Sequence, residues 1–119
     1  MMTFADLTHA LDTTGIMFTP YEWDTPPQNM DAWGTVLIGT SNVLYGGDCV
    51  AEEFLAGTIQ MCTRVLDSTA FNAVTAVLRR LMEEEPVFSF KMTGVRFDRN
   101  ERVIYYSWRW SGAILTGFE

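Results

Sequence analysis

Few side chains in this 119-residue chain could carry out chemistry, and they do not form a catalytic pattern. Nucleophilic catalysis by serine or cysteine usually needs a histidine base, and His9 is the only histidine. No motif that presents a nucleophile flanks His9. Glu52 and Glu53 are adjacent on a predicted strand, so they point to opposite faces and cannot form an acid–base pair. We therefore expect no catalytic residues and no enzymatic activity.

The sequence also predicts no metal or cofactor site. Structural zinc usually takes four Cys or His ligands, whereas Cys49, Cys62 and His9 are three scattered candidates. No segment places acids at alternate positions with a closing glutamate, as a calcium loop would. Gly46-Gly47 lacks the Lys-Ser/Thr ending of a phosphate-binding loop and leads into a strand, so it predicts a turn. A Cys49–Cys62 disulfide is possible, but two reduced, buried thiols are favoured because no secretion signal precedes them.

Composition indicates one folded domain covering residues 1–119. The chain is 48% hydrophobic and 13% aromatic, which argues against disorder and is enough for a core of its own. No run approaches the roughly 20 apolar residues of a membrane-spanning helix. We therefore expect no membrane association.

Charge is distributed unevenly along the chain. The net charge is −7, and eight acids but no base precede Arg64. The overall acidity argues against a protein dedicated to nucleic acid, since such binding depends on phosphate neutralisation. Either folding interleaves the two halves, or the molecule presents one acidic and one near-neutral or basic surface, which would suit head-to-tail association of copies.

Periodicity and turn residues predict two helices and several strands. The segments are a capped helix from Thr3 to Gly15, an edge run over 16–23, strands over 33–39, 43–45 and 50–63 separated by turns at 40–42 and 46–48, a helix from Asp67 or Ser68 to Pro86, and a hairpin of 88–97 and 102–115. The second helix has an apolar stripe consisting of Phe71, Val74, Leu78, Leu81 and Met82. Ile104, Tyr106, Trp108 and Trp110 alternate on the core face of the last strand.

These elements predict an α+β domain. Helices are too few for repeated β-α units, so we expect one mostly antiparallel sheet with two main helices packed on one face. Ala56-Gly57, in the middle of the long strand, predicts a bulge or a close backbone approach.

The order of the elements resembles the siphophage family of minor tail and tail-terminator (tail-to-head joining) proteins. The matching segments are Phe18-Thr19-Pro20-Tyr21-Glu22-Trp23, Pro26-Pro27 before Trp33-Gly34-Thr35-Val36-Leu37, Tyr45-Gly46-Gly47-Asp48, Thr58-Ile59-Gln60-Met61-Cys62-Thr63, the helix from Phe71 to Met82, and the final two strands. The resemblance spans nearly the whole chain and rests on element order and residue character. Relatives often carry basic residues leading into the long strand, whereas this chain has Glu52 and Glu53 there.

The resemblance implies a non-enzymatic bacteriophage or prophage assembly protein. Such proteins form a hexameric ring that caps the tail tube and joins it to the head connector, so the implied partners are further copies, the tail tube protein and the connector. The implied locations are the virion tail and, during assembly, the host cytoplasm.

Interface candidates come from the charge pattern. An aromatic beside acids on a projecting hairpin suits contact with a neighbouring copy, and arginines of the second half are its natural counterparts. The candidates are Tyr45, Asp48, Glu52, Glu53, Phe54, Arg79, Arg80, Arg96, Arg99 and Arg102. The alternative is a small bacterial α+β domain, dimeric or binding an apolar ligand on its aromatic sheet face.

Overall fold

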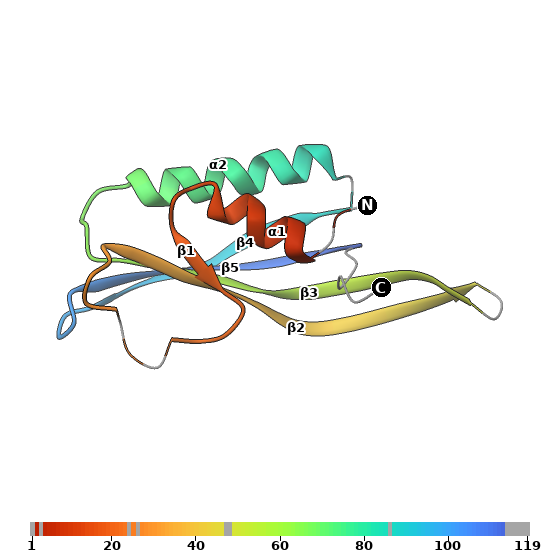
Figure 1. Ribbon diagram of the computed structural model, residues 1–119, viewed down its shortest axis with the longest axis horizontal. Helices are drawn as coiled ribbons and strands as arrows, with labels where there is room; N and C mark the ends of the chain where they lie inside the picture. The colour runs from red at the N-terminus through yellow and green to blue at the C-terminus, as the bar shows by residue number, and fades with distance from the viewer. Residues whose placement is uncertain are drawn as a thin grey trace.

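Seven elements make up the fold in a computed structural model that describes residues 2, 4–23, 25, 27–46, 49–85 and 87–113, with backbone alone for 40–46, 49–54 and 113. They are α1 (Phe4–Asp12), β1 (Met17–Thr19), β2 (Ala32–Gly46), β3 (Cys49–Thr63), α2 (Thr69–Glu84), β4 (Ser89–Asp98) and β5 (Val103–Ala113). The strands form one sheet in the order β1-β2-β3-β5-β4, in which β1 and β2 pair in parallel and every other pair is antiparallel. Both helices pack on the same face of this sheet (Figure 1). The predicted α+β class, with a mostly antiparallel sheet and two helices on one face, is confirmed.

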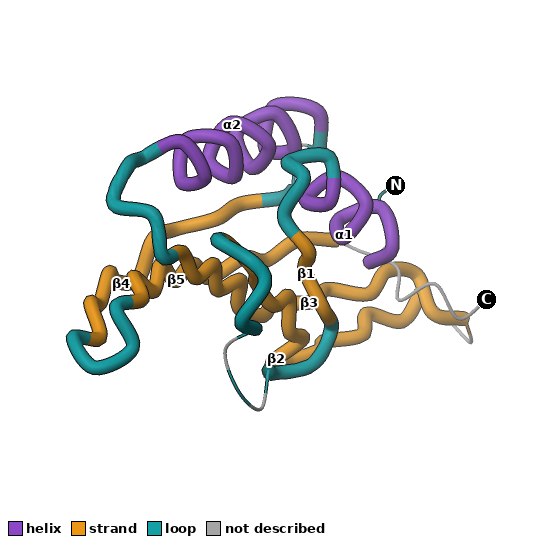
Figure 2. Tube along the Cα trace, turned by 60° about the vertical axis from the view of Figure 1, so that its left-hand side comes forward, coloured by secondary structure: helices purple, strands orange, loops and turns teal. Residues whose placement is uncertain are grey.

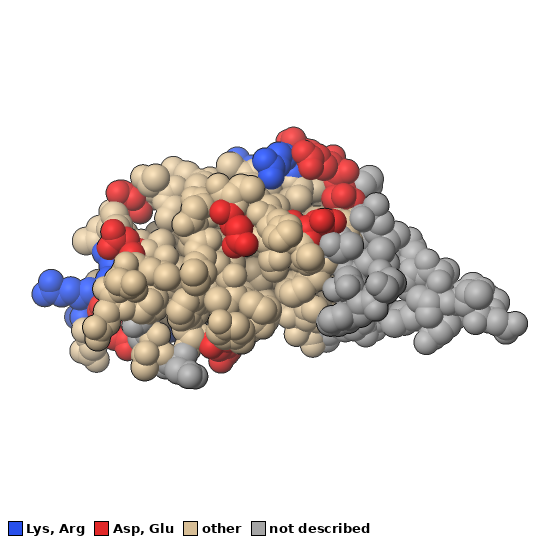
Figure 3. All heavy atoms as spheres, viewed as in Figure 1, with Lys and Arg blue, Asp and Glu red and all other residues tan. Residues whose placement is uncertain are grey.

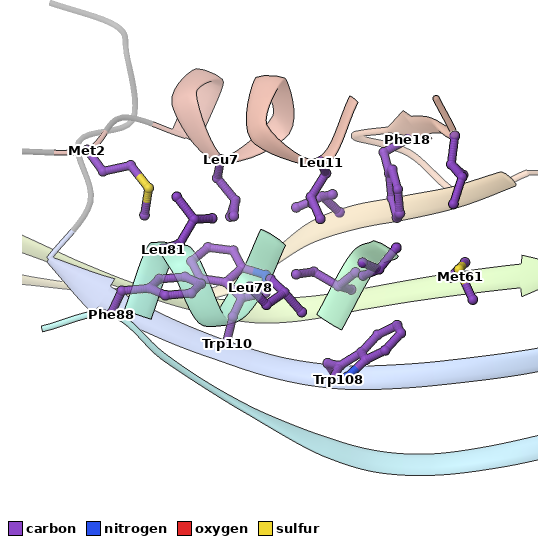
Figure 4. Close-up of a cluster of buried hydrophobic side chains, with 14 of the residues drawn as sticks. Met2, Leu7, Leu11, Phe18, Met61, Leu78, Leu81, Phe88, Trp108 and Trp110 are labelled. Atoms are coloured by element: carbon purple, nitrogen blue, oxygen red, sulfur yellow. The ribbon is translucent and has the colours of Figure 1, made fainter. Parts of the chain in front are cut away.

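The core lies between the two helices and the sheet. Leu7 and Leu11 of α1 and Leu78 and Leu81 of α2 point toward Trp110 of the sheet (Figure 4). Trp108 and Trp110 are 1% and 2% exposed, as expected for core residues. Figure 2 shows the helices forming one layer over the strands.

The predicted helices are confirmed, with one correction. Gly15 follows α1 with a φ of 83°, the left-handed geometry that glycine adopts freely at the end of a helix. Asp67 Oδ1 accepts the Thr69 N–H at 3.0 Å at the start of α2. Met82 was expected on the buried stripe of α2 but is 43% exposed, because the contact with the sheet follows Val74, Leu78 and Leu81.

The expected turn at 40–42 is wrong, because β2 continues through it as one 15-residue strand. The ladder to β3 pairs Ser41 with Leu55 and Asn42 with Phe54. A register shift between Ile38 and Thr40 adds a residue to β2 opposite β3, which keeps the polar segment in the ladder. Backbone pairing has therefore overridden the turn preference of these side chains.

The close approach expected at Gly57 is present. A Cβ atom at Gly57 would overlap the Leu37 carbonyl oxygen and lie 2.8 Å from Cζ2 of Trp110. Gly57 and Trp110 are cross-strand partners, so the indole fills the space that a side chain at 57 would occupy.

The loop between β1 and β2 runs on the side of the sheet away from the helices, which we call the outer face (Figure 1). It covers a second buried cluster, consisting of Trp33, Cys62 and Val103. Arg64 anchors this loop by donating to the carbonyl oxygens of Pro27 and Met30, each at 2.6 Å. Val103 of β5 is fully buried on this face, because the loop covers it.

No helix in the described part of the chain is long and apolar enough to cross a membrane.

Candidate functional site

The β4–β5 turn presents two arginines on a defined scaffold. Asp98 Oδ1 accepts the backbone N–H groups of Asn100 at 2.9 Å and Glu101 at 3.1 Å, which fixes the turn. Arg102 follows with a φ of 57°, a left-handed conformation that costs a non-glycine residue about 1 kcal/mol. Arg99 and Arg102 are both exposed. The turn therefore holds two guanidinium groups at one end of the sheet.

The other arginine candidates lie away from this turn. Arg96 is on β4, with its guanidinium carbon 4.3 Å from the ring centroid of Tyr105. Arg79 and Arg80 are on the exposed side of α2, where Arg80 Nε lies 3.9 Å from Glu84 Oε1. That pair is about half exposed on each side, so it adds at most a few tenths of a kcal/mol. The five arginines therefore do not form one basic surface.

The acidic candidates lie on a projecting pair of strands. The last described pairing of β3 with β5 is Phe54 with Ala113, and among the described residues the segment 49–53 of β3 pairs with β2 alone. We call residues 43–46 and 49–53 the ribbon. The ribbon contains Tyr45, Glu52 and Glu53, and Phe54 is the next residue of β3. The structure describes these four residues by their backbone alone, and Asp48 lies outside the described residues.

The ribbon and the β4–β5 turn lie at opposite ends of the long axis of the molecule, which measures 54 × 29 × 22 Å (Figure 1). Figure 3 shows Lys and Arg atoms together with Asp and Glu atoms at the end that carries this turn, and a group of Asp and Glu atoms beside Lys and Arg atoms over the far end of α2. The fold thus separates the acids of the ribbon from Arg99 and Arg102. A single molecule cannot bring these two groups together, but two copies can.

Sequence reasoning missed an apolar strip beside the turn. Val95 and Phe97 of β4 are 58% and 50% exposed. They pair with Tyr106 and Ile104 of β5, so they lie on the sheet face that the helices cover. However, α2 reaches only as far as Phe71, whose ring stacks on Tyr106 with centroids 5.0 Å apart, and does not extend over Val95 and Phe97. We call Val95, Phe97 and Ile104 the apolar strip.

The apolar strip results from a bulge in β4. Simple alternation from Phe88 through Phe90 and Met92 would place Val95 and Phe97 on the outer face. A register shift between Met92 and Gly94 inserts one residue and moves both side chains to the helix face. Gly94 within a predicted strand was the available signal, since glycine there often marks a bulge.

Cys62 is a free, buried thiol. Burial raises its pKa from 9.0 to about 12, and nearby Arg96 lowers it only in part. The thiol therefore stays protonated and is a poor nucleophile. Cys49 and Cys62 lie at opposite ends of extended β3, and 13 residues of strand at about 3.3 Å each separate them by about 40 Å. A disulfide between them within one chain is excluded, since it needs Cα atoms within about 7 Å.

The candidate metal ligands do not come together in the described residues. His9 lies on the exposed side of α1. No three His, Cys, Asp or Glu side chains gather as metal ligands in the described ranges. The aromatic sheet face that could bind an apolar ligand is filled, because Trp108 and Trp110 pack beneath the helices.

No protein-family model matches this chain, and no curated protein matches its sequence.

Proposed function

We propose that this protein is a bacteriophage or prophage tail-completion protein that forms a ring of identical copies. In this role it caps the tail tube, stops its growth and offers a surface to the head connector, in the virion tail after assembly in the host cytoplasm. The hexamer, the tube protein and the connector follow from the resemblance in element order. The physical support comes from the two unlike ends of the sheet.

The observation that carries the proposal is the separation of complementary surfaces along one molecule. The ribbon holds Glu52 and Glu53, and the opposite end holds Arg99 and Arg102 beside the apolar strip. A heterologous contact, in which the ribbon of each copy meets the turn of the next, closes into a ring when the rotation between copies divides a full turn. An isologous dimer could use the same two patches twice, and the mass measured in solution distinguishes it from a ring.

The two sheet edges are also unlike. β1 pairs with β2 only from Trp33 to Thr35, so among the described strands the outer edge of β2 is free from Val36 onward. β2 contains no charged residue, whereas β4, at the other edge, carries Lys91 and Arg96. Free edges offer unpaired N–H and C=O groups to a further strand. The free edges of β2 and β4 therefore allow one copy to pair with the next in a head-to-tail arrangement.

Within the described part of the chain, the two strands of the ribbon pair only with each other. A two-stranded hairpin is marginally stable in water, and this one includes the apolar residues Val43, Leu44, Tyr45 and Val50. Burying part of that surface on the apolar strip of a neighbour would stabilise both, while the arginines of the turn meet the glutamates of the ribbon. This geometry supports assembly as the function, and we expect no catalytic activity.

The test measures mass in solution by light scattering, with and without tail tubes, and compares Glu52→Lys/Glu53→Lys with Glu83→Lys/Glu84→Lys. The control pair makes the same change in charge on exposed residues of α2. We expect hexamers, in solution or on the tube, that the ribbon variant loses and the control variant keeps, while both melt within about 2 °C of the parent protein. The loss should be larger at low salt, where charges act over longer distances.

Two results would refute the proposal. One is a protein that stays monomeric both alone and with tail tubes. The other is assembly of the ribbon variant at low salt as complete as that of the parent protein. A gene next to one for a major tail protein would support the assignment independently.

A further inference from the structure

A pocket of about 300 Å³ opens on the outer face of the sheet, away from the helices and the apolar strip. Three aromatic residues line it, Trp23 from the loop before β2, Trp33 from β2 and Tyr105 from β5. Glu22 and Glu101 line it on the sides of the loop and the β4–β5 turn. We call this cavity the aromatic pocket. Its volume is at the low end for ligand sites and suits a single side chain.

Hydrogen bonds hold the walls in place. The Trp23 indole Nε1–H donates to the Gly34 carbonyl oxygen at 3.0 Å, which fixes the loop side. The Tyr105 hydroxyl donates to Glu101 Oε2 at 3.1 Å, which fixes a carboxylate at the opposite side. Trp33 is 2% exposed beneath the anchored loop. The aromatic pocket is therefore formed before any ligand arrives, which lowers the entropic cost of binding.

The residues that line the pocket carry negative charge, while Arg64 and Arg96 stack on two of its rings without belonging to the lining. Glu22 and Glu101 form no ion pair with a described residue, and no lysine or arginine is among the described residues that line the pocket. Cys62, at the base, stays a neutral thiol because burial raises its pKa to about 12. Two carboxylates beside aromatic faces are the usual surroundings of a bound organic cation.

The protein already places guanidinium groups on two of these rings. The guanidinium carbon of Arg64 lies 4.7 Å from the Trp33 ring centroid, and that of Arg96 lies 4.3 Å from the Tyr105 centroid. Arg64 is committed to the carbonyl oxygens of the loop, so its charge serves the fold. Planar guanidinium groups stack on aromatic rings and pair with carboxylates at the same time.

We propose that the aromatic pocket binds the arginine side chain of a polypeptide, with its guanidinium against the aromatic walls and paired with Glu22 and Glu101. The aromatic pocket shares the β4–β5 turn with the proposed ring contact, since Glu101 precedes Arg102, but its walls come from one molecule and its binding can be measured without a ring. It gives the outer face a contact with a basic segment of a partner protein.

The experiment titrates ¹⁵N-labelled protein with Nα-acetyl-arginine amide and follows indole and amide shifts by NMR. Nα-acetyl-citrulline amide, which has nearly the same shape without the charge, is the control ligand. We expect saturable shifts at Trp23, Trp33 and Tyr105 with a dissociation constant on the order of 1 mM, since one cation–aromatic contact and exposed ion pairs each contribute modestly. Citrulline should bind at least tenfold more weakly.

Matched variants separate the pocket from general charge. Glu22→Gln/Glu101→Gln keeps the shape of both side chains and should weaken arginine binding about tenfold, whereas Glu83→Gln/Glu84→Gln should change it less than twofold. Both pairs change exposed residues, so both variants should fold, which melting curves check. The proposal is overturned if citrulline binds as well as arginine, if shifts cluster elsewhere, if no saturation occurs by about 20 mM, or if the first variant binds like the parent protein.

Discussion

Replacing Trp110 with alanine tests whether the last strand is core or interface. Trp110 is 2% exposed, and its ring centroid lies 6.1 Å from that of Phe4 in α1. It also fills the space above Gly57, and its Nε1–H donates to the Thr58 carbonyl oxygen at 3.3 Å. One side chain thus joins α1, β3 and β5, and its removal leaves a cavity where these three elements meet.

The expected loss is about 4 kcal/mol of unfolding free energy. Truncating a buried tryptophan to alanine costs about 3–5 kcal/mol from lost burial and the cavity left behind. The carbonyl of Thr58 also loses a donor, a contribution of about 1 kcal/mol at most. Since domains are stable by about 5–15 kcal/mol, Trp110→Ala removes a large share of the total. Trp110→Phe keeps an aromatic ring and should cost about 1–2 kcal/mol.

Urea unfolding followed by circular dichroism measures these losses. Phe97→Ala is the matched control, because Phe97 is on the same sheet face but 50% exposed, beyond the cover of α2. We expect it to cost about 1 kcal/mol or less, in line with its partial burial. If Trp110→Ala costs less than about 1 kcal/mol, or no more than Phe97→Ala, the packing argument is refuted. A variant too unstable to fold agrees with it, and Trp110→Phe then supplies the measurement.

Three further predictions concern two single residues, Cys62 and Arg102. In a Cys49→Ser variant, where Cys62 is the remaining thiol, folded protein at pH 8 should react with a thiol reagent about 1,000-fold more slowly than unfolded protein. The reason is that the pKa of Cys62 rises from 9.0 to about 12 on folding, which lowers the fraction of reactive thiolate. Equal rates would contradict this. Because the pKa of Cys62 is higher in the folded protein, the unfolded protein loses the thiol proton at a lower pH. The unfolding free energy should therefore be highest below pH 9 and should fall as the pH rises toward about 12. Denaturation at several pH values checks this. Arg102→Gly should raise the unfolding free energy by about 1 kcal/mol by relieving the left-handed φ, yet weaken ring assembly measured by light scattering. Arg102→Lys keeps the charge and should assemble, and assembly by the glycine variant equal to that of the parent protein would remove Arg102 from the interface.

Local sequence determined the elements and their inward faces. Alternating apolar residues specified the core side of β5, and the 3.6-residue spacing of Val74, Leu78 and Leu81 specified that of α2. The small residue at 57 indicated a close backbone approach that Trp110 fills. These features depend on neighbours within one element, so a pattern along the chain was enough to find them.

Tertiary structure alone decided which surfaces remain exposed. Bulges at 38–40 and 92–94 extend β2 through its polar segment and turn Val95 and Phe97 to the helix face, where α2 is too short to cover them. The aromatic pocket joins residues from a loop, three strands and a turn that are up to 83 positions apart, from Glu22 to Tyr105. Arg64 holds that loop in place through backbone carbonyl groups, which every sequence has and no sequence pattern distinguishes. Register and coverage depend on pairing between distant segments, and that is the physical reason the ends of the sheet and the outer face could be described only once the chain was folded.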